Sequence, residues 1–278
     1  MKKKYTYPTV LTIAGTDPTG GAGIQADLKT FAALGCYGMS VVTALVAQNT
    51  CGVRAIHSVP PEFVKEQLLA VLEDIKPDAI KIGMVHSVGL VNVIAEVLGN
   101  YPDIAVVFDP VMISTSGHRL IEQDTVSAIV EKLFPVSALI TPNMDEASLL
   151  AGIPVREIDD MYEAAAAIMQ MNPKALLLKG GHLQSERLTS MLVNASGLVQ
   201  EYHSDKIETQ NMHGSGCTLS SAIASYLAIG LSLKDAVTKA QEYVHGAILN
   251  AADVVIGKGN GPLNHSYNPQ KMIKNEMV

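Results

Sequence analysis

Short apolar runs recur along this chain, and a segment with helical spacing follows most of them. Thr9–Ala14 is β-branched and apolar, and the apolar positions after Gly23 recur at helical spacing until Gly35, which is placed to end a helix. Strands that alternate with helices form βαβ units, so we expect a three-layer α/β/α fold with a mostly parallel central sheet. The same pattern predicts strands at 39–46, 79–83, 105–109, 138–141 and 175–179, and helices near 61–72, 87–98, 120–134, 143–170, 216–230 and 233–252.

The alternation of strands and helices is interrupted near residues 188–203, where two apolar runs flank Ala195-Ser196-Gly197. This pattern predicts a hairpin, and therefore an antiparallel edge on the sheet. The chain shows neither a linker nor a repeat, so we expect one domain over residues 1–278. The Gly/Asn/Pro-rich tail after Gly257 is expected to lie on the surface or to fray.

Charge and composition exclude several classes of protein. The net charge is −7, and Lys2–Lys4 is the one block of basic residues, which argues against a nucleic-acid partner. Apolar runs stay below the roughly 18 residues of a membrane span, and the short apolar N-terminal run ends at Gly15 without a signal-peptide cleavage pattern. Three cysteines without CxxC spacing indicate a reducing compartment, so we expect a cytoplasmic protein without a membrane partner.

Polar or glycine-bearing tails follow the predicted strands. Ligands of open α/β sheets bind beyond the carboxyl ends of the strands, so these tails are expected to converge on one edge. In chain order the tails are GTDPTGGAGIQAD (15–27), AQNT, GM, DPVM, TPNMDE and KGGH. The first matches neither the dinucleotide fingerprint nor the P-loop. Its Asp27 either faces this edge or serves as a favourable charge near a helix N-terminus.

HGSGC (213–217) precedes a long apolar helical segment. Gly214 and Gly216 allow positive φ and close backbone approach, so the amides of Ser215, Gly216 and Cys217 can bind an anion at the helix start. A simple glycine turn with Ser215 as the helix cap is an alternative interpretation of the same residues. A helix N-terminus lowers the pKa of a thiol, which would make Cys217 reactive, although free cysteine is also a common core residue.

Two further tails carry groups that suit Mg²⁺ and phosphate. Asp109 ends one strand, and Asn143 with Glu146 follows another, a set that could hold Mg²⁺ through one or two protein ligands. A capping box on the next helix explains Asn143 and Glu146 equally well. Lys179 ends an apolar strand beside two glycines, where it either reaches a phosphate or extends to solvent.

Seven of these segments, in this order, resemble the vitamin-kinase branch of the ribokinase superfamily, and within it the bacterial hydroxymethylpyrimidine/phosphomethylpyrimidine kinases. They are LTIAGTDPTGGAGIQADLKTF, GMSVVTALVAQNT, KIGM, FDPVM, ITPNMDEA, LLLKGGH and HGSGCTLSSAIA, and the resemblance covers about residues 9–265. It implies a ribokinase-like kinase of thiamine biosynthesis. Such an enzyme uses ATP and Mg²⁺ to phosphorylate 4-amino-5-hydroxymethyl-2-methylpyrimidine and then its monophosphate.

The resemblance also implies roles for individual residues. The aminopyrimidine would be bound by Gly15, Asp27, Val46, Gln48, Met84 and Val111, with Gln48 hydrogen-bonded to the ring. Mg²⁺ would be held by Asp109 and Glu146, and the nucleotide by Asn143, Lys179, Ser215 and Gly216. The catalytic group would comprise Cys217, Gly214, Gly216 and Lys179.

Cys217 stands where sugar kinases of the superfamily carry an aspartate base, and we hypothesise that its thiolate is the base here. Two alternatives stay open: a pyridoxal kinase of the same branch, and a non-catalytic pyrimidine-binding protein. The resemblance also suggests a homodimer, for which the hairpin near 188–203 and the segment near 50–58 are candidates. Residues 115–120 and 182–188 are predicted to be mobile loops over the site.

Overall fold

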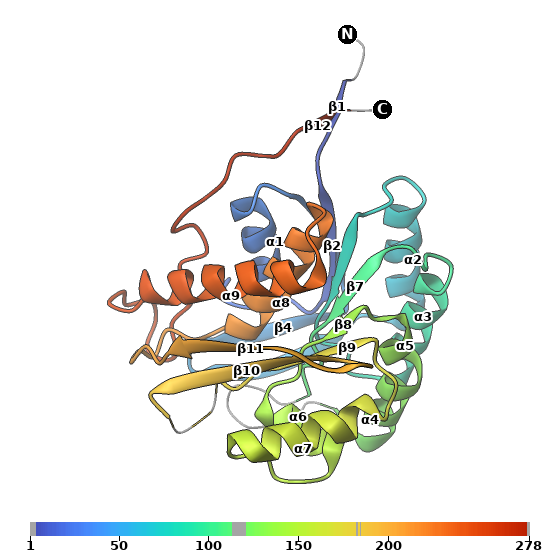
Figure 1. The fold of residues 1–278 in the computed structure, drawn as a ribbon. Coiled ribbons are helices and arrows are strands. Elements are labelled where there is room, and N and C mark those ends of the chain that lie inside the picture. Colours follow the sequence, from blue (N-terminus) through green and yellow to red (C-terminus); the bar gives the residue numbers. More distant parts are fainter. Residues whose placement is uncertain (1–3, 113–120, 182, 184, 277–278) are drawn as a thin grey trace.

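The computed structural model describes residues 4–112, 121–181, 183 and 185–276. Its main sheet has eight strands in the order β11-β10-β9-β8-β7-β6-β2-β3 (Figure 1). The pairings from β3 across to β9 are parallel, while β10 is antiparallel to both β9 and β11. This confirms the mostly parallel sheet with an antiparallel edge hairpin. The strands are β2 (Thr9–Ala14), β3 (Tyr37–Val42), β6 (Ala79–Ile82), β7 (Ala105–Phe108), β8 (Leu139–Ile140), β9 (Ala175–Leu178), β10 (Arg187–Asn194) and β11 (Gly197–Asp205).

Helices cover both faces of the sheet. One face carries α1 (Gly23–Ala33), α8 (Ser215–Ala228) and α9 (Leu233–Leu249). The other carries α2 (Pro61–Leu72), α3 (Val88–Leu98), α4 (Gln123–Ala128), a π-helical turn η1 (Ile129–Leu133), α5 (Phe134–Val136), α6 (Met144–Ala151) and α7 (Ile158–Met169). Figure 1 shows α8 and α9 on one side of the hairpin strands and α6 and α7 on the other. The expected three-layer architecture is therefore confirmed.

Side chains along each buried strand alternate between the two hydrophobic cores. In β9, Leu176 and Leu178 pack in the core under α2, α3 and α7, while Ala175 and Leu177 pack in the core under α8 and α9. The same alternation turns Lys81 of β6 toward the layer of α1 and α8, because its neighbours Ile80 and Ile82 face the opposite core. A lysine directed into a helix layer requires a partner there.

The strand predicted at 39–46 is extended as expected, but it is divided in two, because the chain leaves the sheet at Thr43. The Thr43 N–H donates to the carbonyl oxygen of Ala14. The chain then forms β4 (Ala44–Asn49), which pairs with β5 (Gly52–Ser58) in a separate two-stranded ribbon. The helical segment predicted at 143–170 is likewise divided, because Gly152 adopts φ +71° and ends α6 before α7 begins.

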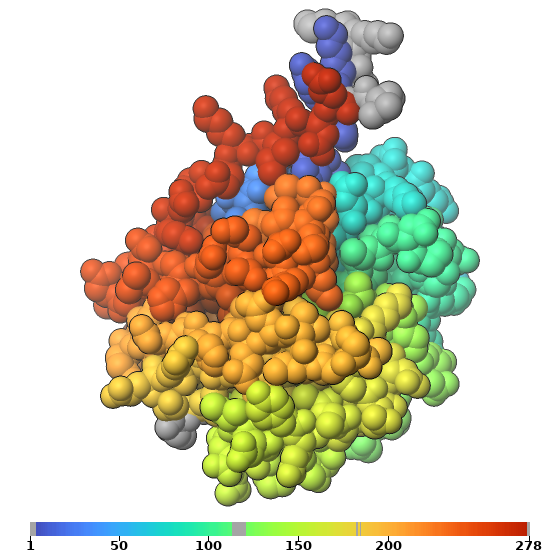
Figure 2. Space-filling view, viewed as in Figure 1, coloured from blue at the N-terminus to red at the C-terminus, as the bar shows by residue number. Residues whose placement is uncertain are grey.

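The tail after Gly257 lies along the body of the molecule. We call residues 258–276 the C-terminal strap. Its Gly261 carbonyl oxygen accepts from the N–H of His213, and a hydrogen bond of 3.1 Å joins the His265 ring to the Thr218 hydroxyl. The strap ends in β12 (Asn275–Glu276), which pairs with β1 (Tyr5–Thr6), and Figure 2 shows the two terminal segments projecting together from the body.

Across the part of the chain that the structure describes, none of the helices combines the length and the apolarity that a membrane crossing requires.

Candidate active site

A cavity of about 1090 Å³ lies at the carboxyl edge of the sheet, where the sequence predicted that the strand tails converge. The tails of β2, β6, β7, β8 and β9 contribute to its wall, together with the β4–β5 ribbon and the start of α8. The structure brings these predicted site residues to the cavity: Gly15, Val46, Gln48, Met84, Asp109, Val111, Asn143, Glu146, Lys179, Gly214, Ser215, Gly216 and Cys217. The first predicted mobile loop, 115–120, lies outside the described residues, as do positions 182 and 184 of the second.

The start of α8 is built from bare backbone. Gly214 is the N-cap at φ +82°, and no side chain caps the helix, so the Ser215 cap considered above is not formed. A Cβ at Gly214 would lie 1.9 Å from the carbonyl oxygen of Gly21, and therefore only glycine fits where the two loops touch. The Ser215 N–H donates to the carbonyl oxygen of Met212 at 3.1 Å. The next N–H groups of the first turn, those of Gly216 and Cys217, lack intrahelical partners and are therefore available to an anion in the cavity.

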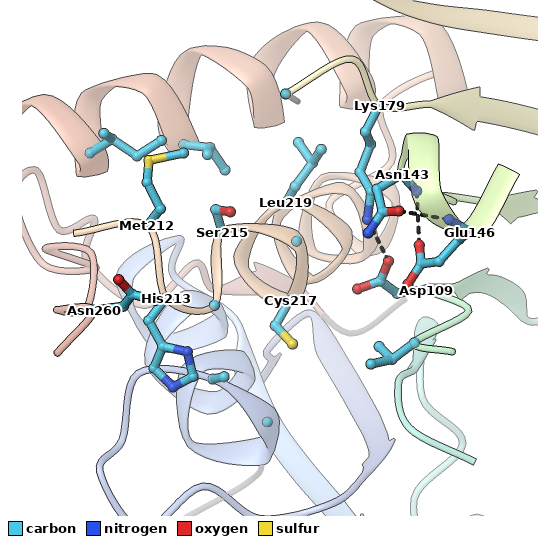
Figure 3. A pocket seen from close by; sticks show the side chains of 18 of the residues that line it. Asp109, Asn143, Glu146, Lys179, Met212, His213, Ser215, Cys217, Leu219 and Asn260 are labelled. Atoms are coloured by element: carbon cyan, nitrogen blue, oxygen red, sulfur yellow. Dashed lines mark hydrogen bonds and ion pairs between the residues drawn. The ribbon is translucent and has the colours of Figure 1, made fainter. Parts of the chain in front are cut away.

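A lysine and an aspartate stand beside this helix start (Figure 3). The Lys179 Nζ atom lies 2.7 Å from Oδ1 of Asp109, which also accepts from the Thr141 hydroxyl at 3.0 Å. A Cβ at Gly216 would lie 3.2 Å from that Nζ and 3.5 Å from the other Asp109 oxygen. Burial opposes ionisation of Asp109, but Lys179 and Lys81 outweigh it and hold the pKa of this carboxyl below its usual range.

Asn143 and Glu146 form the capping box of α6. The Asn143 side chain accepts from the Glu146 N–H at 2.9 Å, and the Glu146 carboxylate accepts from the Asn143 N–H at 2.8 Å. Burial raises the pKa of Glu146 to about 7, against the opposing effect of Lys179. The capping role is therefore confirmed, and it leaves a buried carboxyl group at the cavity whose ionisation a cation would favour.

The residues at this edge fit a magnesium ion. Among the described residues there is no cluster of three or more His, Cys, Asp or Glu side chains with metal-binding geometry. Mg²⁺ requires fewer protein ligands, because it keeps several waters and is commonly held by one or two carboxylates plus substrate phosphates. Asp109 and Glu146 supply two carboxylates to the cavity wall, Lys179 is paired with Asp109, and this donor set suits a divalent cation bound with a nucleotide.

The expected low pKa of Cys217 is corrected by the structure. Burial raises the pKa of its thiol to about 11; Lys81 and the Gly23 N–H act in the opposite direction, while Asp27 and Asp109 raise it further. The helix start does not outweigh the removal of water and the two nearby carboxylates. Figure 3 shows the thiol directed into the cavity from the first turn of α8, so its position agrees with the prediction although its ionisation does not.

The prediction that Asp27 lines the pocket is also corrected. Asp27 is fully buried and is absent from the cavity wall. Each of its oxygens lies 2.9 Å from the Lys81 Nζ atom, and the carboxylate also accepts from the hydroxyls of Thr12 and Ser221. Asp27 therefore ties α1 and α8 to β2 and β6 from beneath the cavity.

Asp17 and His213 line the cavity but were given no role in the sequence interpretation. The buried Asp17 carboxylate accepts from the N–H groups of Thr19, Gly21 and Ala22, and from Nε2 of His213 at 2.8 Å. The ring of His213 packs on Gly21, where a Cβ would lie 2.5 Å from its Cδ2 atom. The Asp17-Pro18 dipeptide inside a glycine-rich loop was the signal available in the sequence.

The cavity extends beyond the α8 start between β11 and α9, a part that the sequence interpretation also missed. Its wall there includes Leu219, Val244 and Ile248, with Thr238 and Gln241 among the polar residues. These apolar side chains come from two helices that only the tertiary structure brings together. A flat apolar group of a ligand fits this part while its anionic end reaches the α8 start.

The fold and this edge define the class of protein: a ribokinase-like small-molecule kinase, in which a bare helix start stands beside a lysine–aspartate pair at the carboxyl ends of a parallel sheet. The chain belongs to the phosphomethylpyrimidine kinase family, whose model matches residues 17–264.

Several relatives support this membership. The chain is 47% identical over 258 residues to the hydroxymethylpyrimidine/phosphomethylpyrimidine kinase of Rhizobium meliloti, covering 92% of this chain and 96% of that protein. It is also 47% identical to a probable thiamine biosynthetic bifunctional enzyme of Oryza sativa, covering 95% of this chain but 49% of that enzyme. The chain therefore spans about half the length of the bifunctional relative.

Solved structures show the same fold. A phosphomethylpyrimidine kinase from Clostridium difficile is 45% identical with a TM-score of 0.76, covering 86% of this chain and 99% of that chain. A pyridoxal kinase from Bacillus subtilis, in complex with ADP, is 33% identical with a TM-score of 0.87, covering 94% and 98%.

Proposed function

We propose that this chain transfers the γ-phosphoryl group of ATP to the hydroxymethyl group of 4-amino-5-hydroxymethyl-2-methylpyrimidine, and then phosphorylates the monophosphate to the pyrophosphate. One observation carries the proposal: the uncapped start of α8, beside Lys179 and Asp109, opens into the same cavity as the tails of β2 and β4. The names of the relatives, among them the kinase of Rhizobium meliloti, support this pair of reactions.

We assign separate parts of the cavity to the two substrates. The heterocycle would lie against Gly15, Val46, Gln48, Met84 and Val111, and the nucleotide base in the apolar part between β11 and α9. The α8 start lies between them, so its backbone N–H groups would bind the phosphoryl group in transfer. Backbone donors fixed in this way stabilise charge that develops in the transition state without reorganising.

Positive charge at the transferring group would come from two sources. Lys179 is held at the α8 start by Asp109, where its ammonium can contact phosphate oxygens. Mg²⁺, held by Asp109 and Glu146, would neutralise phosphate charge. Phosphoryl transfer proceeds through a loose transition state and requires little covalent chemistry from the protein, so position and charge account for most of the catalysis.

Cys217 lines the cavity at the start of α8, and we propose it as the group that receives the hydroxyl proton of the acceptor alcohol. Because burial raises its pKa to about 11, the thiolate fraction rises about tenfold per pH unit through the neutral range. If Cys217 is the base, kcat increases with pH between 7 and 9, and Cys217→Ala loses both this slope and at least 100-fold in kcat. Near-normal turnover with a flat profile in the alanine variant would sink the assignment.

A product analysis tests the reaction itself. The protein is incubated with ATP, Mg²⁺ and the hydroxymethylpyrimidine, and both the monophosphate and the pyrophosphate are expected. A parallel reaction with pyridoxal covers the second candidate, which the fold similarity to the Bacillus subtilis pyridoxal kinase favours. A higher kcat/KM for pyridoxal would reverse the order of the two candidates.

We also propose that the protein is a homodimer. The β4–β5 ribbon exposes Leu45, Val53 and Ile56, which supports an apolar contact between copies. Sedimentation equilibrium checks it, and a mass close to the 29.5 kDa of one chain at micromolar concentration would contradict it.

A further inference from the structure

The turn of the β4–β5 ribbon is hydrogen-bonded to a segment 208 residues further along the chain. Thr50 lies in this turn, and its hydroxyl oxygen accepts from the N–H groups of Lys258 and Gly259, both at 3.1 Å. A hydroxyl oxygen has two lone pairs, so one threonine satisfies both donors. The Thr50 carbonyl oxygen also accepts from the Asn260 N–H at 3.0 Å. We call these three hydrogen bonds the Thr50 contact.

The two backbones meet so closely at the Thr50 contact that side chains are excluded on the C-terminal side. A Cβ at Gly259 would lie 2.1 Å from the Thr50 carbonyl oxygen. Gly257 adopts φ +80°, and a Cβ there would lie 2.4 Å from the Thr50 hydroxyl oxygen. Two glycines of the tail that composition marks as prone to fray are therefore required by a specific contact with the ribbon.

The C-terminal strap is fixed to the body of the molecule beyond this contact. The Gly261 carbonyl oxygen accepts from the His213 N–H at 3.1 Å, just before the start of α8. The His265 carbonyl oxygen accepts from the hydroxyl of Tyr243, a residue of α9, at 2.6 Å. The Thr50 contact therefore joins the ribbon turn to a segment that is itself held by two helices.

The β4–β5 ribbon depends on attachments of this kind. Among the described residues it forms a sheet of its own, and an isolated two-stranded hairpin is only marginally stable. At its base, the Thr16 N–H donates to the Ala44 carbonyl oxygen and the Thr16 hydroxyl accepts from the Val46 N–H, both at 3.0 Å. The Thr50 contact holds the opposite end. Val46, Gln48 and Thr50 all line the cavity, so both attachments bear on its wall.

We propose that Thr50 is a positioning residue: its contact with the C-terminal strap holds the β4–β5 ribbon in place as a wall of the heterocycle part of the cavity. This rests on the proposed function for the identity of the ligand there. A wall that is ordered before binding spares the ligand the cost of ordering it, so a loosened ribbon weakens binding. Because the wall contacts the ring both before and during transfer, the effect falls on KM for the hydroxymethylpyrimidine rather than on kcat.

Two variants remove the Thr50 contact from opposite sides. Thr50→Val keeps the shape of the side chain without its acceptor, whereas Gly259→Ala places a Cβ against the Thr50 carbonyl oxygen from a residue outside the cavity wall. In each, KM for the hydroxymethylpyrimidine should rise about tenfold, as for the loss of one or two neutral hydrogen bonds. The values of kcat and of KM for ATP should stay within about threefold. The double variant should raise KM no further than the larger single effect.

Two controls separate positioning from general damage. Thr50→Ser retains the hydroxyl and should keep all three kinetic values within about threefold of the unsubstituted protein. Thr9→Val removes a hydroxyl that joins two distant segments through Asp78 at 3.0 Å, outside the cavity wall, and KM for the hydroxymethylpyrimidine should not change.

Hydrogen exchange provides a readout that does not depend on the substrate. Measured by mass spectrometry, the amides of the ribbon, residues 44–58, should exchange faster in Thr50→Val and Gly259→Ala than in the unsubstituted protein, because the ribbon opens locally more often. Thr9→Val should leave the exchange of the ribbon unchanged. Unchanged exchange in both latch-side variants, Thr50→Val and Gly259→Ala, would overturn the proposal.

A KM that rises in Thr50→Val but not in Gly259→Ala would also overturn it, because Thr50 would then act by touching the ligand directly. If Thr50→Val fails to fold, an unchanged KM in Gly259→Ala overturns the proposal by itself. The two proposals fail separately. A missing phosphorylated product with faster exchange of the ribbon contradicts only the proposed function, whereas normal products with an unchanged KM in both variants contradict only this inference.

Discussion

Two lysine–aspartate pairs lie within this one site, and they differ in where their lysines stand along a strand. Lys81 is the third residue of β6 and points into the helix layer; although it belongs to the cavity wall, it is bonded to Asp27, and both side chains are 0% exposed. Lys179 follows the last residue of β9, lines the cavity beside Asp109, and its side chain is 13% exposed. A lysine inside a buried strand thus joins layers, whereas one just past the strand end can reach a ligand.

The first prediction has the largest expected effect and removes the ammonium group of Lys81. Lys81→Met leaves Asp27 charged and unpaired in the core, and unfolding in urea should show a loss of about 3–5 kcal/mol in the free energy of unfolding. The double variant Lys81→Met/Asp27→Leu removes both charges and should recover most of that loss. A single variant as stable as the unsubstituted protein would contradict the structural role of this pair.

The second prediction concerns the pair that faces the cavity. Lys179→Met removes the ammonium beside the α8 start, and kcat should fall about 100- to 1,000-fold, as for the loss of one donor to a developing charge. Steady-state kinetics with saturating ATP and Mg²⁺ provide the measurement. A loss of less than tenfold, with unfolding stability unchanged, would show that Lys179 does not act on the transferring group.

The third prediction concerns His265, a buried titratable residue whose ring is hydrogen-bonded to a hydroxyl, whereas each lysine above is paired with a carboxylate. Burial lowers the pKa of His265 from 6.5 to about 4, so the unfolded chain binds a proton at this residue before the folded chain does. The free energy of unfolding should therefore fall as pH drops below 6.5, by about 2 kcal/mol between pH 7 and 5. His265→Gln should reduce this slope, and an unchanged slope in this variant would contradict the prediction.

The prediction with the smallest expected effect concerns Asn143, which lines the same cavity as Lys179. It tests whether Asn143 only caps α6 or also binds the nucleotide. Asn143→Ala removes the N-cap of α6 and should cost about 1 kcal/mol in stability. Ser87→Ala removes the N-cap of α3, which lies outside the cavity wall, and should cost a similar amount. If Asn143 also contacts the nucleotide, only its variant raises the KM for ATP, and equal KM values would restrict Asn143 to capping.

The sequence was sufficient to predict the sheet, its edge hairpin and the edge where the tails converge. Short apolar runs, helical spacing and the glycines that end these segments depend on local chemistry, which a single sequence displays. The partners of Asp27 could not be predicted, because Lys81 is 54 residues away and Ser221 is 194 residues away. Because the sequence does not show that these residues lie side by side in space, Asp27 was assigned to the ligand and Lys81 was given no role.

The ionisation of Cys217 was predicted wrongly for a related reason. A helix N-terminus is visible in the sequence, but the loss of water around the thiol and the proximity of Asp27 and Asp109 are not. The apolar part of the cavity between β11 and α9 was missed because its residues come from elements that are separate in the sequence. Charge balance and burial at the site therefore require the tertiary structure.

The C-terminal strap has a consequence for how the protein matures on the ribosome. Its Gly261 and His265 hold His213 and Thr218, which flank the helix start that would bind phosphate. Residues 261 and 265 are synthesised after the whole of that helix, so these contacts can form only once the helix has been made. The contacts that hold the α8 start are therefore among the last to form during synthesis of the chain.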